Sequence, residues 1–359
     1  MTAMRKSVLA AMTAAAAVGI LLRPGELSGA VGDAVAACLE VLIPALFAFT
    51  VLAVYLQQSG LYMTALAPLT KPLSLLLGIP GELCAVFLLA NIGGYPVGAR
   101  LLAQLVRSGR LSRRDAGRML CCCYGSGPSF VIGTAGTVVF GSAAVGGVIY
   151  AACFLSSLII AVFVCRTGER ITLSGGEVRV DLTAECFVRS VDSGARVMYT
   201  VCIMSVAFSA LTALLESVGV NRLTAELLGA AGCGGNSSRI LPALLDVTRV
   251  REMIPSGEFA VPLCAGLLSF GGVCVIIQVL AVSGGSVPVR WLLVSRLPAA
   301  VLSAVLSLPA GLMADSSAAV YAANTGTAEL FSVNAGLSVC VMAMAGMLIL
   351  SFGKQRDES

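Results

Sequence analysis

The sequence contains no histidine, and only 12% of its 359 residues are charged. Histidine is the commonest general base and a frequent transition-metal ligand, so its absence argues against an enzyme and against a metal site. We therefore expect no catalytic residues, no metal and no cofactor. The 23 basic and 19 acidic residues are too few for a disordered chain, a nucleic-acid-binding module or a soluble metabolic enzyme.

Apolar residues make up 58% of the chain, and the mean hydropathy is +0.95. This is more apolar surface than one soluble core buries, so we expect an all-α polytopic membrane protein in the cell membrane. The 13 cysteines include the run Cys121 to Cys123 but no C-x-x-C pair, and most lie in apolar stretches. We interpret them as small hydrophobic residues rather than disulfides or zinc ligands.

Six apolar segments are long enough to be candidate membrane spans on the basis of about 20 apolar residues per helix. They cover residues 7–22, 36–57, 144–165, 194–218, 288–312 and 335–352. The first is short and follows Arg5 and Lys6, so it is either a cleaved signal peptide or a retained helix. Retention is favoured, because Arg23 follows directly and no clear A-x-A cleavage site is present.

Four further apolar segments, 82–106, 112–141, 222–250 and 257–283, contain helix-breaking residues. Glycine lowers helix propensity and proline cannot donate a backbone hydrogen bond. The first and third are therefore predicted to be re-entrant hairpins, and the second and fourth to be broken helices. The expected break residues are Gly93, Gly94, Pro96, Gly125, Gly127, Pro128, Gly271 and Gly272.

The breaks recur in the same order in both halves of the chain. An offset of 143 residues places Leu101 on Leu244 and Gly127 on Phe270, although few residues are identical. Counting the broken helices as spans predicts about eight transmembrane helices plus two re-entrant hairpins, with the two halves inverted in the membrane. The expected units are an N-terminal helix and outer loop (1–35), a first repeat (36–165), a cytosolic linker (166–192), a second repeat (193–312) and a C-terminal helix and tail (313–359).

The distribution of basic residues gives the orientation, because lysine and arginine gather on cytoplasmic loops. With the N-terminus inside, all but seven of the 23 basic residues lie on inner loops. Five lie on the outer side, namely Arg23, Arg222, Arg239, Arg249 and Arg251. Two lie within apolar segments, namely Arg100 and Arg296. The cluster from Arg107 to Arg118 is interpreted mainly as a topology signal and alternatively as a binding site for anionic lipid headgroups.

Uncharged polar residues near the breaks are the candidate binding residues for a small polar solute, because broken backbone at membrane depth must face protein or water. They are Asn91, Tyr95, Ser126, Ser129, Asn236, Ser237, Ser269 and Gln278. Each has an alternative role as an ordinary interhelical hydrogen-bonding group. The breaks themselves are alternatively packing kinks.

Two acidic residues lie at or near apolar segments. Asp246 is the candidate coupling group for a proton or sodium ion, since an intramembrane carboxylate marks a functional site by default. It is equally a candidate partner of Arg249, three residues further along a helix. Glu40 is expected at the membrane interface.

Several motifs resemble the sporulation integral membrane protein YlbJ family. They are GGYPVGARLL, CCCYGSGPSFVIGTAG, LLDVTR and SFGGVCVIIQV, and the resemblance covers roughly residues 36–310. It implies two Gate-like (nucleoside-recognition) repeats, at about 45–155 and 205–310. One departure stands out: the family pattern before Gly-Pro is CNNxGP, whereas this chain has Cys123, Tyr124, Gly125 and Ser126.

The resemblance implies a role in spore formation, usually in assembly of the spore cortex, but no substrate. We expect a membrane protein that moves or gates a small polar solute across the cytoplasmic or forespore membrane. The alternative is a structural or assembly protein of the sporulation membrane that does not transport. Expected partners are membrane lipid, the solute and other sporulation membrane proteins, with no nucleic acid.

Overall fold

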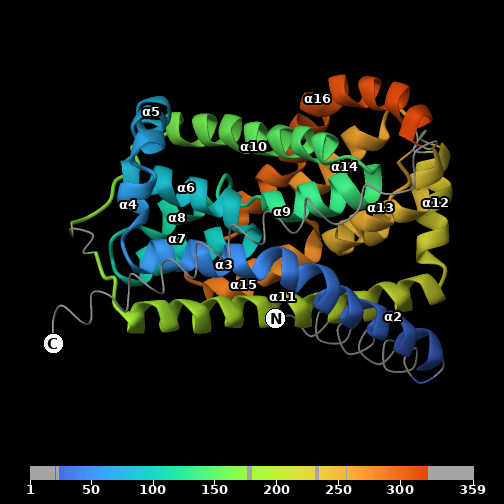
Figure 1. Cartoon of the computed structure of the whole chain (residues 1–359), viewed down its shortest axis with the longest axis horizontal. Helices are drawn as coiled ribbons and strands as arrows, with labels where there is room; N and C mark the ends of the chain where they lie inside the picture. The colour runs from blue at the N-terminus through green and yellow to red at the C-terminus, as the bar shows by residue number, and fades with distance from the viewer. Residues whose placement is uncertain (1–20, 22–23, 176–179, 231–233, 256, 322–359) are drawn as a thin grey trace, which may run out of the picture.

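The computed structural model describes residue 21 and residues 24–175, 180–230, 234–255 and 257–321, and these residues form helices and loops without a strand (Figure 1). The prediction of an all-helical architecture is confirmed for this part of the chain. The predicted span 335–352 lies outside the described residues, as does the predicted span 7–22 apart from Leu21.

The first half of the chain contains helices of very different length. They are α2 (Pro24–Ala37), the π-helical η1 (Cys38–Leu42), α3 (Ile43–Gln58), α4 (Tyr62–Ala65), α5 (Ala67–Leu77), α6 (Gly81–Gly93), α7 (Tyr95–Arg107), α8 (Arg113–Leu120), α9 (Pro128–Phe130), the π-helical η2 (Val131–Val139) and α10 (Ala143–Arg166).

The second half follows a connector and contains a similar mixture. Its elements are α11 (Ala184–Ser217), α12 (Val220–Ala230), η3 (Gly234–Asn236), α13 (Ser237–Leu245), η4 (Val247–Glu252), α14 (Ala260–Phe270), α15 (Gly272–Ser283) and α16 (Arg290–Tyr321).

Four helical stretches are long and apolar enough to cross a membrane: 143–166, 184–217, 260–283 and 290–310. The number rises to six if two bent pairs each count as one span, namely 24–58 with a bend of 57° and 67–93 with a bend of 108°. These helices indicate a multi-pass membrane protein with four to six candidate spans among the described residues. Exposed large apolar side chains such as Phe163, Ile203 and Leu297 lie on these helices, as lipid contact requires.

The long helices enclose the broken ones. In Figure 1, α10 and α11 run along opposite sides of the molecule, with α6, α7, α9 and α15 between them. Helix α11 packs on α3, α2 and α15, whereas α10 packs on η2, α14 and α16. Consistent with this enclosed position, nearly every residue of α6 is buried.

Two predicted boundaries differ from the structure. Residues 24–35, expected in an outer loop, are helical, with Pro24 in the first turn and acidic Glu26 near the helix N-terminus, where both are favoured. Helix α11 begins at Ala184 rather than near 194, because the Thr183 hydroxyl caps it at 3.2 Å from the Cys186 N–H. The linker between the two halves is correspondingly shorter than predicted.

The connector before α11 is fastened to the first half rather than solvated along its length. The Ser174 N–H donates to the Arg110 carbonyl, and the Asp181 N–H donates to the Ser59 carbonyl, each at 2.9 Å, while Ile171 is buried. The Thr183 hydroxyl donates to the Asp181 carboxylate at 2.7 Å, and this bond holds the pKa of Asp181 below its ordinary value.

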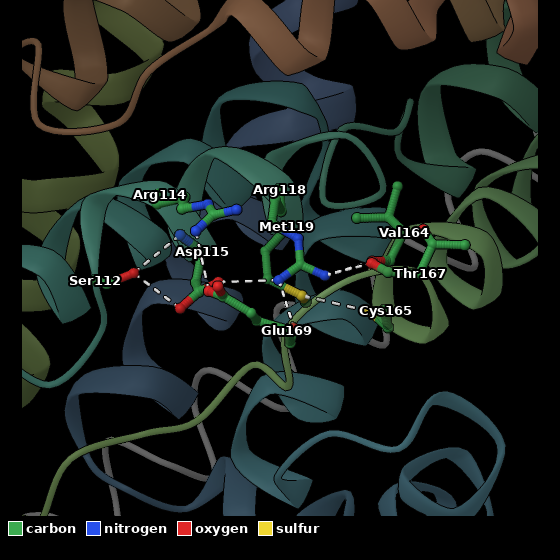
Figure 2. A network of polar contacts seen from close by, with 9 residues as sticks. All are labelled: Ser112, Arg114, Asp115, Arg118, Met119, Val164, Cys165, Thr167 and Glu169. Carbon is green, nitrogen blue, oxygen red and sulfur yellow. Dashed lines mark hydrogen bonds and ion pairs between the residues drawn. The ribbon is translucent and has the colours of Figure 1, made fainter.

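Arg118 fastens the same end of the molecule from within (Figure 2). Its guanidinium donates to the carbonyls of Val164, Thr167 and Glu169 at 2.8 to 2.9 Å and to Asp115 at 3.1 Å. The side chain is only 7% exposed. It therefore closes the carbonyl end of α10 and holds the start of the connector against α8.

Other arginines of the 107–118 cluster also bind protein groups. Arg110 forms a two-pronged ion pair with buried Glu82, both contacts at 2.7 Å, and Arg114 contacts Glu169 at 2.9 Å. Arg113 donates to the Gly285 carbonyl in the loop between α15 and α16 at 2.8 Å. The cluster thus joins the start of α6, the connector before α11 and the α15–α16 loop at one end of the bundle, a role that the sequence did not predict.

Candidate functional site

Three helix breaks lie close together inside the bundle. Helix α6 gives way to α7 at Gly94, whose φ of 93° lies in the region that favours glycine. Helix α8 ends at Leu120, and a non-helical stretch up to Gly127 leads into α9. Helix α14 gives way to α15 at Gly271, with a φ of 84°. The corresponding turn between α12 and α13 lies partly outside the described residues.

Close backbone contact joins the first two breaks. A Cβ at Gly98, in the first turns of α7, would overlap the Cys123 carbonyl of the second break. Only glycine therefore permits this approach of α7 to the chain between α8 and α9.

A narrow central cavity lies beside the first two of these breaks. About 40 Å³ of it is open to the centres of water-sized molecules. The walls combine the α6–α7 turn, the N-terminal end of α9, the start of η4, the inner face of α15, and parts of α3 and α11. The residues that supply polar groups or broken backbone are Thr50, Gly93, Gly94, Tyr95, Gly127, Asp246, Thr248 and Gln278.

The remaining wall of the central cavity is apolar. It includes Leu46, Phe130, Met198 and Val275. A mostly apolar wall with a few converging polar groups is typical of small-molecule sites.

Two of the predicted solute-binding residues line this cavity. The Tyr95 hydroxyl donates to the Leu268 carbonyl near the end of α14 at 2.6 Å, so it also ties α7 to the third break. Gln278 is 3% exposed, and its amide nitrogen makes one weak contact, at 3.3 Å, with the Cys274 sulfur. The Gln278 side chain therefore keeps hydrogen-bonding capacity for a bound molecule.

Asp246 lies between α13 and η4 and is 2% exposed. Its carboxylate accepts hydrogen bonds from the Ser205 hydroxyl of α11 at 2.6 Å and from the Thr248 N–H at 3.0 Å. The Thr248 hydroxyl is 3.4 Å from the Ser205 hydroxyl. Three side-chain oxygen groups are thus gathered at this point.

Arg249 does not pair with Asp246. Its guanidinium is directed to Glu252 at 3.4 Å and to the Ser209 hydroxyl at 3.1 Å. Asp246 is therefore not an ion-pair partner of Arg249 on a helix. Residues 247–252 form a 3-10 helix, and Asp246 caps its N-terminus by accepting a hydrogen bond from the Thr248 N–H.

The other predicted solute-binding residues do not line the central cavity. Asn91 donates to the carbonyls of Phe87 and Cys122, and Ser269 donates to the Ala299 carbonyl, so both hold helices together. Asn236 bonds twice to the Ile254 backbone. Ser126 is buried in the second break, whereas Ser129 in α9 and Ser237 at the start of α13 are partly buried elsewhere.

Arg296 is the residue that the sequence analysis missed. It lies on α16, is 2% exposed, and donates to the carbonyls of Cys121, Tyr124 and Ser269. These carbonyls belong to the chain after α8 and to the end of α14, where backbone acceptors lack helical partners. The Arg296 guanidinium therefore supplies hydrogen bonds to backbone carbonyls at both the α8–α9 break and the α14–α15 break. Its signal in the sequence was a single arginine within the predicted span 288–312.

Comparison with known proteins gives no relative: no family model, no curated protein and no solved structure matches this chain. The motifs quoted above are the sole basis of the resemblance to the YlbJ family.

Proposed function

We propose that this protein is a membrane transporter or gate for a small polar solute, which binds in the central cavity. The observation that carries the proposal is the meeting of the α6–α7 break, the α8–α9 break and the α13–η4 junction around one cavity that has a buried carboxylate in its wall. Broken helices that meet at a cavity are the recurring construction of secondary transporters. No enzymatic step is part of the proposal.

The proposed architecture is an inverted repeat with eight spans and two re-entrant hairpins. Its support is the similar order of elements in the two halves. Helices α6 and α7 pack together as a pair, and so do α12 and α13. The break between α8 and α9 has a counterpart between α14 and α15, and each is followed by a long helix, α10 or α16.

The chemistry of the cavity supports a neutral or weakly charged solute. The amide of Gln278 and the hydroxyls of Tyr95 and Thr50 offer directional hydrogen bonds, whereas the rest of the wall suits an apolar group. Asp246 is the proposed coupling group for a cation, because it is a buried carboxylate that forms no ion pair with the described residues.

The proposed setting is the cytoplasmic or forespore membrane during cortex formation, and its support is the motif resemblance alone. A second candidate function is a non-transporting assembly protein of the same membrane. The hydrogen bonds of Asn91, Asn236 and Ser269 favour it, because these side chains stabilise the fold instead of pointing at a solute.

Uptake into proteoliposomes separates the two candidates. Transport predicts saturable uptake of one solute class that Gln278→Leu abolishes, because this change removes the amide and keeps the volume of the side chain. The matched control is Gln104→Leu on α7, an exposed residue away from the cavity, which should leave uptake unchanged. Absence of uptake from well-folded protein, together with a stable co-purifying membrane partner, would favour the assembly role.

A further inference from the structure

Two polar hollows lie between α2 and α11 and lead toward Asp246. The one farther from Asp246 leaves about 560 Å³ open to the centres of water-sized molecules and is lined by Glu26, Asp33, Glu216 and Arg249. The nearer one leaves about 290 Å³ and is lined by Asp33, Glu40, Asp246, Arg249, Arg251 and Glu252. They share Asp33 and Arg249, so we treat them as one feature, the acidic vestibule.

The acidic vestibule ends at the wall of the central cavity. Asp246 and Thr248 line the vestibule on one side and the central cavity on the other. The partition between the two spaces therefore consists of Asp246 and the residues that hold it, Ser205 and Thr248. A molecule or ion moving from the vestibule inward would meet the Asp246 carboxylate first.

The charge of the vestibule favours cations. Its lining contains six carboxylates and two arginines, and Arg249 is partly neutralised by Glu252 at 3.4 Å. A cleft lined by an excess of one sign of charge concentrates ions of the opposite sign. The narrow end presents the carboxylate of Asp246 beside the hydroxyls of Ser205 and Thr248, and oxygen ligands of this kind suit small hard cations.

The vestibule opens at the end of the bundle opposite the basic loops. Helix α12 and the N-terminal part of α2 lie at one end of the molecule in Figure 1, whereas α4 and α5 lie at the other. The second end also carries the ion pairs of Arg110 and Arg114. Because basic loops face the cytoplasm, the vestibule faces the outer side.

We infer that the acidic vestibule is the access route by which a small alkali cation reaches and binds Asp246 from the outer side of the membrane. The inference rests on the proposed function of Asp246 as a coupling group. It adds the class of the ion, the route and the side of access.

The route is tested by labelling reconstituted protein from outside with membrane-impermeant methanethiosulfonates of either charge. Ala36→Cys lines the vestibule, and Val35→Cys on the same helix is the matched control, since Val35 is 43% exposed but does not line the vestibule. When each rate is divided by the rate of the same reagent with a free thiol in solution, the cationic trimethylammonium-ethyl reagent should modify position 36 at least about tenfold faster than the anionic sulfonate. Position 35 and the wild type should show no such preference. Equal rates, or no labelling at position 36, would overturn the route.

Binding is tested by the Tm of the purified protein when sodium, lithium or potassium replaces choline at constant ionic strength. One of these cations should raise the Tm of the wild type, and Asp246→Asn should remove that rise. Thr200→Val changes a half-buried residue of α11 whose hydroxyl donates to the Arg196 carbonyl, and it should retain the rise. No cation effect, an effect that survives in Asp246→Asn, or stabilisation by acid alone would overturn the assignment.

These results are distinguishable from failure of the proposed function. A cation effect at Asp246 without solute uptake would keep the access route and reject transport. Solute uptake that is indifferent to alkali cations and to Asp246→Asn would keep transport and reject the inference.

Discussion

The guanidinium of Arg296 lies 4.5 Å from the centre of the Tyr124 ring, and the same group donates hydrogen bonds to the carbonyls of Cys121, Tyr124 and Ser269. The Tyr124 ring is also 4.9 Å from the ring of Tyr95, which lines the central cavity. A buried cation, two aromatic rings and three helix breaks are therefore parts of one connected arrangement. Through Tyr124, Arg296 supports Tyr95 in the wall of the central cavity.

Replacement of Arg296 should destabilise the protein more than any other arginine change on α16. Arg296→Met leaves the Cys121, Tyr124 and Ser269 carbonyls without their charged donor, at a cost of roughly 3 kcal/mol or more. Arg290→Met, at the exposed start of the helix, is the matched control and should cost little. The measurement is the Tm of both variants in detergent. Equal Tm values would show that the breaks do not depend on Arg296.

Gly98→Ala should lower stability because its Cβ would overlap the Cys123 carbonyl. Overpacking at such a contact costs typically about 1–3 kcal/mol. The control is Gly147→Ala on α10, where a Cβ meets nothing within 4 Å and alanine is the better helix former. We expect a lower Tm for the first variant and an unchanged or slightly higher Tm for the second. The opposite order would refute the close approach of α7 to the second break.

Arg118→Ala should release the connector at the basic end of the bundle. The side chain is buried and holds three carbonyls there, so its loss should expose residues 167–175 to hydrogen exchange and to protease (Figure 2). Arg114→Ala is the comparison, since its ion pair with Glu169 is largely exposed and worth less than about 1 kcal/mol. Similar exchange in both variants would contradict the role of Arg118.

The two ends of α10 should be accessible from opposite sides of the membrane. The helix has 24 residues, which at 1.5 Å per residue span about 36 Å and exceed the hydrocarbon core. Ala143→Cys, at the first residue of this helix, and Ser174→Cys, after its last residue, are both exposed positions. An impermeant thiol reagent should label position 143 from outside and position 174 from the cytoplasmic side. Labelling of both from one side would show that α10 does not cross the membrane.

Local composition predicted the helical class of the protein and where several helices are interrupted, because glycine and proline act on their own backbone. The turn at Gly94 and the change of helix at Gly271 lie within the motifs that the sequence analysis identified. The long apolar helices α10 and α11 were also predicted from the sequence, although α11 begins earlier than predicted because Thr183 caps it.

The residues that line the site were less predictable, because tertiary packing determines which hydrogen-bond partner each side chain has. Asn91 and Ser269 have the residue types of a binding site, but backbone carbonyls distant in the sequence take up their hydrogen-bonding groups. Arg296 depends on the same kind of partner: its acceptors are unpaired carbonyls more than 25 residues away, which no sequence pattern marks.

A thermal-shift screen of the purified protein tests the central claim most directly, with nucleosides, amino sugars, dicarboxylates and other small polar solutes as ligands. A ligand at 100 times its dissociation constant stabilises the folded state by about 2.7 kcal/mol. The account predicts that one class raises the Tm, that Gln278→Leu removes the rise, and that Asn236→Ala, outside the cavity, keeps it. A rise that persists in Gln278→Leu, or no rise for any solute with well-folded protein, would contradict a solute site in the central cavity.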